Sequence, residues 1–399
     1  MRFLVFVLTI SAFAADSGTG LNQERLQTIK PRLQALVDGH EIPGAVALVA
    51  RHGKVALTEA VGWRDVENQK PMQTDSIFQI MSMTKNFTGV AVMMLVDEGK
   101  VELRQPIEHY LPEFRGIQVE ERFNGRGAVH PPVHPPTVCE LMDHTSGLGG
   151  DPEGEMADNP RTMRVPLADA VRFYAHSHLQ FEPGARWSYS NMGIATLGRL
   201  IEVISGEDYV HFVRTHILEP LGMRDTFYFP PEDKKDRIAL VYLHKDGKLV
   251  RAGDDILAGD AAKYRPGAKY PAPEFGLYST APDLVKFYQM LLNGGEYGGR
   301  RYLSKQAVQT MTRVFTPDVR PSGWLGGTGY GLTFEIVNQP EGTLLMHSPG
   351  TFGHGGAFGT EGWIDPKNDL IRIMLVQVDD GSGDAPRSVV MQIGEAAVE

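Results

Sequence analysis

The sequence predicts one α/β sheet domain that is split along the chain and carries a largely helical insertion. Short apolar, strand-like runs occupy both ends of the chain, whereas the middle holds helical patterns separated by proline- and glycine-rich connections. The predicted sheet domain comprises residues 22–100 and 275–399, and the predicted helical subdomain comprises residues 101–274. We expect a functional site between these two parts.

The first elements follow from the spacing of apolar residues. Gln23–Asp38 has the period of an amphipathic helix, although Pro31 argues against an uninterrupted one. Ala45–Ala50 and Val55–Val61 are short apolar runs that predict a β-hairpin. Met83–Glu98 repeats apolar residues at helical spacing and predicts a second helix.

Capping signals and proline mark the helices that follow. Thr137–Glu140 has the spacing of a capping box and predicts a short helix before His144. Met192–Ser205 predicts another helix, and Gly276–Asn293 contains one that we expect to start after Pro282.

The last hundred residues return to strand patterns and end in a helix. We expect a turn at Asp365–Asn368 and a closing helix over Ala385–Ala397. The predicted strands are Gly329–Val337, Leu344–His347, Gly355–Ile364 and Leu370–Val378.

Residues 1–14 are typical of a secretory signal peptide. Arg2 precedes an apolar stretch, and Ala12 and Ala14 have the A-x-A arrangement of a cleavage site. The alternative, a membrane anchor, needs about 20 apolar residues, and this stretch is shorter. We therefore expect a periplasmic or secreted bacterial protein that has no membrane insertion after signal cleavage.

Composition excludes several classes of partner and cofactor. The chain has 39 basic and 49 acidic residues without a basic run, so we expect no nucleic-acid binding. Cys139 is the single cysteine of the sequence, which excludes an internal disulfide. With His130, His134 and His144 it fits no zinc spacing, so we expect no metal. The oligomeric state stays open.

Ser82-Met-Thr-Lys85 is the first candidate for chemistry. On a helix, residues three apart share a face, so Lys85 is expected over Ser82. A serine hydroxyl becomes a nucleophile when a neighbouring base takes its proton, and a buried lysine of lowered pKa can be that base. The alternative is an ordinary solvated helix start.

Tyr189-Ser-Asn191 is the second candidate. A tyrosinate beside a lysine ammonium can act as a general base, because the cation stabilises the phenolate. Asn191 offers both a donor and an acceptor for orienting a substrate carbonyl or the lysine. The alternative is that Asn191 caps the helix that follows.

His354-Gly-Gly-Ala357 is the third candidate, and it is expected to open a strand rich in small residues. Such a strand lets a substrate lie against the backbone, whose N–H groups can face an oxyanion. The alternative is a tight glycine turn with a solvated histidine.

In this order, the three motifs resemble those of the serine β-lactamase and penicillin-binding-protein superfamily. The chain is similar to its class C β-lactamase-like group and especially to the family VIII carboxylesterases. The resemblance covers about residues 24–378. Further matching stretches are His144-Thr-Ser-Gly-Leu148, Pro183-Gly-Ala-Arg-Trp-Ser-Tyr-Ser-Asn191, Gly276-Leu-Tyr-Ser-Thr280 and Phe352-Gly-His-Gly-Gly356.

The resemblance implies the fold, an antiparallel sheet flanked by helices, and a role for each motif. It implies that Ser82 is the acylated nucleophile and that Lys85 and Tyr189 handle its proton. The backbone N–H groups of Ser82 and Ala357 would form the oxyanion hole, and no cofactor is implied. The substrate-binding residues implied are Asn191, His354, Gly355 and Gly356.

His354 departs from the pattern of the antibiotic-hydrolysing members, which have Lys-Thr-Gly at the third motif. A histidine of ordinary pKa is mostly neutral near pH 7, so it attracts a β-lactam carboxylate less than lysine does. It could still donate one hydrogen bond to the substrate. We therefore expect neutral esters to be better substrates than β-lactams.

The sequence thus predicts a serine hydrolase for small-molecule ester or amide substrates, and most directly a carboxylesterase for short- to medium-chain esters. The alternatives are a class C-like β-lactamase, a carboxypeptidase or aminopeptidase specific for D-amino acids, and a penicillin-binding protein that acylates without turnover. An α/β-hydrolase esterase is disfavoured because no G-x-S-x-G occurs.

Overall fold

The computed structural model describes residues 18–123, 126–253, 267–316, 323, 325–379 and 384–399. The predicted signal peptide, residues 1–14, lies outside these ranges. Among the helices that the described residues form, none is long and apolar enough to cross a membrane.

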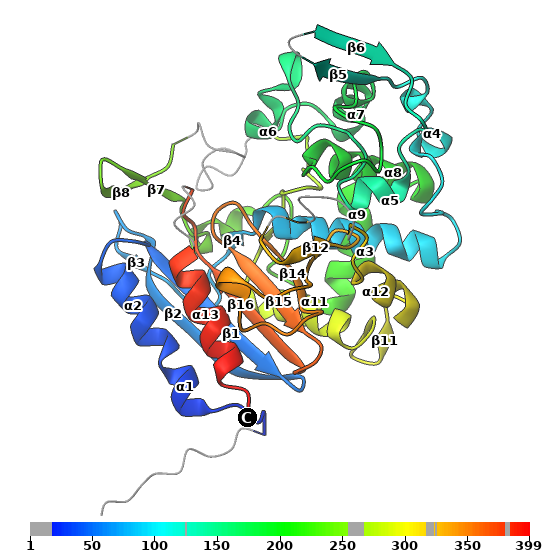
Figure 1. The fold of residues 1–399 in the computed structure, drawn as a ribbon. Coiled ribbons are helices and arrows are strands. Elements are labelled where there is room, and N and C mark those ends of the chain that lie inside the picture. Colours follow the sequence, from blue (N-terminus) through cyan, green and yellow to red (C-terminus); the bar gives the residue numbers. More distant parts are fainter. Residues whose placement is uncertain (1–17, 124–125, 254–266, 317–322, 324, 380–383) are drawn as a thin grey trace, which may run out of the picture.

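The described residues build an eight-stranded antiparallel sheet from both ends of the chain (Figure 1). The two ends meet where β1 pairs with β16, from Val46 opposite Leu375 to Arg51 opposite Leu370. This sheet confirms the predicted fold class. In spatial order its strands are β12 (Thr328–Tyr330), β13 (Glu335–Val337), β14 (Phe352–Gly355), β15 (Glu361–Asp365), β16 (Leu370–Leu375), β1 (Gly44–Arg51), β2 (Lys54–Asp65) and β3 (Lys70–Pro71).

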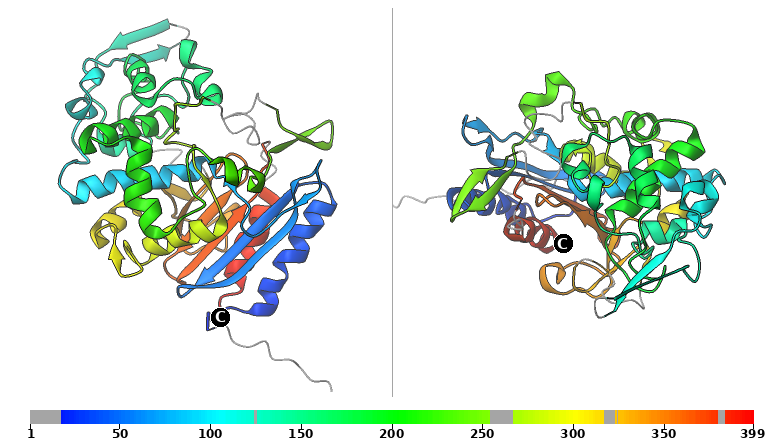
Figure 2. Two further views of the ribbon diagram at one scale, coloured as in Figure 1. Left: turned by 180° about the vertical axis from the view of Figure 1, so that it is seen from behind. Right: turned by 90° about the horizontal axis from the view of Figure 1, so that it is seen from above.

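Helices cover both faces of the sheet (Figures 1 and 2). α1 (Gln23–Gln27), α2 (Ile29–Asp38) and α13 (Asp384–Ala396) lie on one face, and α11 (Ala281–Leu292) packs against β1 and β16 on the other. The side chains of β1 alternate between the two cores, which explains why that strand is apolar at nearly every position.

Between α3 (Thr84–Asp97) and β9 (Tyr278–Ser279) the described chain forms a group of helices that lies beside the sheet, away from α1, α2 and α13 (Figure 1). The exact bounds of the two predicted domains stay a prediction. The helices there are α4 (Ile107–Tyr110), α5 (Val138–Met142), α6 (Asn159–Thr162), α7 (Leu167–Ala175), α8 (Asn191–Ser205), α9 (Tyr209–Val213) and α10 (Glu219–Leu221).

Short strand pairs and one more helix complete the described secondary structure. β4 (Phe78–Gln79) pairs with β9. The further helix is α12 (Lys305–Met311). The remaining pairs are β5 (Val119–Phe123) with β6 (Arg126–His130), β7 (Tyr242–Lys245) with β8 (Lys248–Arg251), and β10 (Glu296–Tyr297) with β11 (Arg300–Arg301).

Several predicted elements are confirmed together with their physical causes. The first hairpin turns at His52 and Gly53, both with positive φ, as a tight two-residue turn requires. The capping box that starts α5 is complete, with the Thr137 and Glu140 side chains each bonded to the other's backbone. The first helix is interrupted as Pro31 suggested, but at Thr28, so that Pro31 falls in the first turn of α2.

Other predicted boundaries are wrong because a turn interrupts an apolar run. Gly329–Val337 is the hairpin of β12 and β13 around Thr333, which has a positive φ. Gly355–Ile364 contains the turn between β14 and β15. Leu344–His347 is not a strand, since it begins at the end of a 3-10 turn and exposes Leu345. α11 starts before Pro282, which lies in its first turn.

α3 is buried on nearly all sides, which its apolar stripe alone did not predict. The buried set includes polar residues such as Lys85, Asn86 and Thr88, and not only the apolar face. A helix buried all round must satisfy each polar side chain inside the protein. Lys85 therefore needs hydrogen-bond partners inside the protein.

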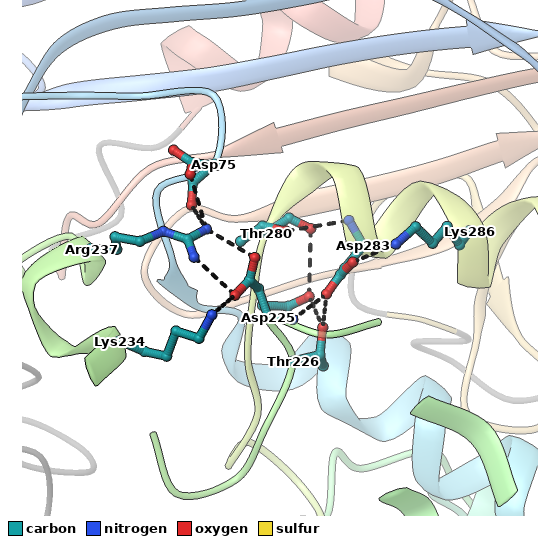
Figure 3. Close-up of polar contacts among 9 residues, drawn as sticks. Asp75, Asp225, Thr226, Lys234, Arg237, Thr280, Asp283 and Lys286 are labelled. Atoms are coloured by element: carbon teal, nitrogen blue, oxygen red, sulfur yellow. Dashed lines mark hydrogen bonds and ion pairs between the residues drawn. The ribbon is translucent and has the colours of Figure 1, made fainter. Parts of the chain in front are cut away.

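A buried carboxylate joins the start of α11 to the segment that follows α10 (Figure 3). Asp283 is 4% exposed. Its carboxylate accepts hydrogen bonds from Asp225 N at 2.8 Å and from Thr226 Oγ1 at 3.1 Å. The same carboxylate forms an ion pair with Lys286 Nζ at 2.8 Å. The Asp225 carboxylate in turn pairs with Arg237 at 2.9 Å. Removing one member of such a cluster leaves the others desolvated and unpaired.

Asp283→Ala should therefore lower the free energy of unfolding by about 3 kcal/mol. Asp169→Ala is the matched control, since it breaks an exposed pair with Arg172 on α7 and should cost less than about 1 kcal/mol. Urea denaturation followed by circular dichroism measures both. Equal effects of the two substitutions would contradict the structural role given to Asp283.

Candidate active site

Ser82 lies in a constrained turn between β4 and α3. The turn is a single 3-10 turn, Met81–Met83, and the α-helix that we expected over Met83–Glu98 begins directly after it, at Thr84. Met81 has a φ of 50°, in the left-handed region that non-glycine residues rarely adopt. Such backbone strain is typical of functional sites, where the surrounding structure holds it in place.

The Lys85 side chain reaches back to Ser82, as the three-residue spacing predicted. Its Nζ donates to Ser82 Oγ at 3.1 Å and to the backbone carbonyl of Glu274 at 2.8 Å. The second contact depends on the pairing of β4 with β9, which places residue 274 beside the start of α3. Lys85 is fully buried.

The charge state of Lys85 follows from this burial. Desolvation lowers the pKa of Lys85 to about 7, although the carboxyl groups of Glu274 and Asp151 favour the ammonium form and partly oppose the shift. Near pH 7 a large fraction of the amine is therefore neutral and has a free lone pair. A neutral amine at this distance can accept the Ser82 proton.

Glu274 is a second buried ionisable group beside Lys85. Burial raises the pKa of the Glu274 carboxyl to about 7, while the Tyr270 hydroxyl, which donates to Glu274 Oε1 at 2.8 Å, favours the ionised form. Glu274 and Lys85 thus titrate in the same range and influence one another.

Tyr189 completes the group around Ser82 and is predominantly a phenol. Its hydroxyl is hydrogen-bonded to Ser82, and its ring lies beneath Lys85 Nζ at 4.6 Å from the centroid. Burial raises the pKa of Tyr189 well above its usual range. Between the two bases that the sequence left open, the Lys85 amine is the one whose basic form is populated near pH 7.

Asn191 is the first residue of α8, and the alternative that it caps this helix is wrong. Ser190 is the cap, because its Oγ accepts from Gly193 N at 2.9 Å. Asn191 Nδ2 donates to Asp151 Oδ1 at 2.8 Å. Its Oδ1 is buried and has no hydrogen-bond partner among the described residues, so it can accept from a ligand.

The third motif ends β14 rather than opening a strand, which corrects the prediction. Gly356 leads into the following turn and lies against the Ser82 turn, where a Cβ would be 2.4 Å from the Ile80 carbonyl oxygen. Glycine is therefore required at this position. Within the described residues, neither the Ser82 nor the Ala357 N–H has a hydrogen-bond partner. This is compatible with the predicted oxyanion hole, which stays a prediction.

His354 is neutral and both of its ring nitrogens have partners inside the protein. Nδ1 bonds to the Gly355 carbonyl at 2.6 Å and Nε2 to the Tyr330 hydroxyl at 2.9 Å. Burial, and after it the charge on Lys85, lowers the pKa of His354 to about 3. The hydrogen bond that we expected His354 to donate to a substrate is thus not available in this structure.

An open cavity adjoins these residues. It has a volume of about 630 Å³, and its lining includes Asp151, Met192, Gln180 and Arg186. Ser82 itself does not line it. A substrate bound at Ser82 and Asn191 could extend a side group into this space.

Sequence reasoning missed three residues of the site: Asp151, Glu274 and Tyr330. Glu274 had a usable signal, because it is the single charged residue in the stretch 270–278 and lies two residues before a matching stretch. The other two carry no signal in one sequence. Among the described residues, no group of three or more His, Cys, Asp or Glu residues could hold a metal ion.

Comparison with known proteins gives one family. A family model described as Beta-lactamase matches residues 29–392. Protein Rv1367c of Mycobacterium tuberculosis is 32% identical over 380 residues, 90% of this chain and 91% of that protein. Esterase EstB of Burkholderia gladioli is 27% identical over 389 residues, 92% and 94% of the two chains. The solved structure of EstCE1, described as a hydrolase with promiscuous acyltransferase activity, has a TM-score of 0.79 at 22% identity, and the match covers 94% of this chain and 98% of that one.

The coupling of Lys85 to Glu274 predicts a shift in the pH dependence of serine reactivity. The rate at which a fluorophosphonate labels Ser82 should rise with pH and reach half its maximum at about pH 7, as the ammonium loses its proton. Glu274→Gln removes a negative charge that stabilises the ammonium, so the midpoint should move to lower pH.

Glu202→Gln is the matched control, since that glutamate pairs with Arg199 on α8 and should leave the midpoint unchanged. The midpoint of each variant is obtained from labelling rates measured by intact-protein mass spectrometry across the pH range. A midpoint that stays or rises in Glu274→Gln would show that Glu274 does not act on Lys85.

Proposed function

The chain belongs to the Beta-lactamase family, and on that premise we propose that it is a serine hydrolase that forms an ester intermediate on Ser82. We further propose that its preferred substrates are neutral carboxylic esters of short to medium chain length. The observation that carries the proposal is the contact of 3.1 Å between Ser82 Oγ and the fully buried Lys85 amine.

The first half of the reaction is acyl transfer to the enzyme. Ser82 gives its proton to neutral Lys85 while Oγ bonds to the substrate carbonyl carbon and the carbonyl electron pair moves to oxygen. The N–H groups of Ser82 and Ala357 hold this oxyanion. The bond to the leaving alcohol then breaks, and the alkoxide takes a proton from the Tyr189 hydroxyl, which is replaced by one from Lys85.

The second half reverses the proton path. A water molecule gives a proton to the Lys85 and Tyr189 pair as its oxygen attacks the acyl carbon. When the intermediate collapses, the carboxylic acid leaves and Ser82 Oγ recovers a proton from the same pair. Asn191 Oδ1, buried and unpaired among the described residues, is available to accept a hydrogen bond from bound substrate.

The preference for neutral esters rests on charge. A substrate carboxylate gains most from a cation at the third motif, and His354 is a neutral ring with both nitrogens occupied. A missing charge-assisted hydrogen bond corresponds to roughly a tenfold to hundredfold loss in rate. The similarity to the protein named esterase EstB supports esters as substrates.

The sequence left three alternatives, and turnover distinguishes them. A class C-like β-lactamase would hydrolyse a cephalosporin better than an ester. A peptidase for D-amino acids would prefer a D-alanyl peptide. A penicillin-binding protein without turnover would give a stable acyl-enzyme and a single burst of product.

The test is a side-by-side measurement of kcat/KM for p-nitrophenyl butyrate, nitrocefin and a D-alanyl dipeptide. The ester value should exceed the nitrocefin value by about tenfold or more. Ser82→Ala should abolish all turnover, whereas Ser205→Ala, at the far end of α8, should retain it. Nitrocefin turnover equal to or above that of the ester would overturn the substrate class, and activity in Ser82→Ala would overturn the nucleophile.

A further inference from the structure

A continuous line of hydrogen bonds runs through three buried rings beside Tyr189. It begins at Ser190 N, which bonds to His144 Nδ1 at 3.1 Å; His144 Nε2 then bonds to the Tyr330 hydroxyl at 3.2 Å. That hydroxyl bonds to His354 Nε2 at 2.9 Å, and His354 Nδ1 ends the line at the Gly355 carbonyl at 2.6 Å. The His144 and Tyr330 side chains are fully buried, and His354 is 7% exposed.

The two ends of this line fix the position of every proton in it. A backbone N–H can only donate, so His144 Nδ1 accepts and the ring proton of His144 is on Nε2. A carbonyl can only accept, so the ring proton of His354 is on Nδ1 and its Nε2 is bare. The Tyr330 oxygen then accepts from His144 while its single proton goes to His354.

We propose that Tyr330 is a positioning and specificity-determining residue: its hydroxyl holds His144 and His354 as neutral rings in opposite tautomers and so withholds His354 from the substrate. The tautomers follow from the hydrogen bonds alone. The consequence for substrate choice rests on the proposed function.

A further proton on either ring would break the line. If His144 were protonated, its Nδ1–H and the Ser190 N–H would be two donors facing each other with no acceptor between them. Protonated His354 would turn an Nε2–H toward Tyr330, whose oxygen already receives the His144 proton and whose own proton would lose its acceptor. Burial also disfavours both cations, as does the charge on Lys85.

The charged and titratable groups around the line come from four elements. Lys85 faces it from α3 and Tyr189 from the segment before α8, while Asp143 lies after α5 and Glu335 on β13. The two carboxyl groups are engaged elsewhere, since Asp143 accepts from Thr145 and Glu335 accepts from Thr328. The Tyr330 hydroxyl is therefore the contact that keeps His354 Nε2 occupied.

The line also ties two parts of the site together. Ser190 lies between Tyr189 and Asn191, and the His144 ring packs on the Tyr189 ring at 4.5 Å between centroids. Gly355 precedes the turn that carries Ala357. Removing the Tyr330 hydroxyl should thus release His354 without removing a group that contacts the reacting atoms.

The first test reads the tautomers directly in the full-length wild-type protein labelled with ¹⁵N-histidine. Two-bond ¹H–¹⁵N correlations should show His144 protonated on Nε2 and His354 on Nδ1, with neither ring titrating between about pH 5 and 8. The loss of each signal in His144→Gln or His354→Gln assigns it. Identical tautomers, or ordinary titration of either ring in the wild type, would overturn the proposal.

The second test compares Tyr330→Phe with Tyr228→Phe, a buried tyrosine whose hydroxyl bonds to Tyr209 away from the line. In Tyr330→Phe the chemical shift of His354 Nε2 should change, because that nitrogen loses its hydrogen bond, and in Tyr228→Phe it should not. The wild-type spectrum alone decides the proposal if Tyr330→Phe does not fold. An unchanged His354 signal in folded Tyr330→Phe would refute it.

The third test measures substrate choice with p-nitrophenyl butyrate and mono-p-nitrophenyl succinate, which bears a carboxylate. Their kcat/KM ratio should move toward the succinate by about tenfold in Tyr330→Phe, because the released His354 ring can then donate a hydrogen bond to the substrate carboxylate. The ratio in Tyr228→Phe should equal that of the wild type. An unchanged ratio in Tyr330→Phe would refute the specificity role, whereas no ester turnover in the wild type would refute the proposed function and leave the tautomer test intact.

Discussion

The burial of one amine determines the chemistry of this site. Lys85 lies on a helix that is buried on nearly all sides, and its Nζ has two contacts at close range, Ser82 Oγ and the Glu274 carbonyl. Desolvation brings its pKa near neutrality, so the amine can be a base without a histidine partner. The same burial raises the pKa of the neighbouring Glu274 carboxyl.

Long-range pairings in the fold maintain this burial. The short pairing of β4 with β9 places Glu274 against the start of α3, and the β14–β15 turn brings Gly356 against Ile80. The loop before α8 supplies Tyr189 from the helical part of the chain. Because Tyr189 and Glu274 come from segments far along the chain from Ser82 and Lys85, the site forms only when the sheet and the helices have packed.

The sequence was sufficient for the fold class and for the three motifs, and insufficient for their surroundings. Periodicity identified the first hairpin and α8, and the Ser82–Lys85 spacing predicted their contact. The predicted strand bounds are wrong where a glycine-rich turn divides an apolar run, as between β14 and β15. The hydrogen bonds that occupy both ring nitrogens of His354 could not be predicted, because one partner, Tyr330, has no local signal in the sequence.

The central claim is that Ser82 becomes acylated because neutral Lys85 takes its proton. Acid quenching within the first turnover of a p-nitrophenyl ester, followed by peptide mapping with mass spectrometry, tests it most directly. We expect the acyl mass on the peptide that contains Ser82 in the wild type, and at least a hundredfold slower accumulation in Lys85→Met. An acyl group on another residue, or undiminished acylation in Lys85→Met, would contradict it.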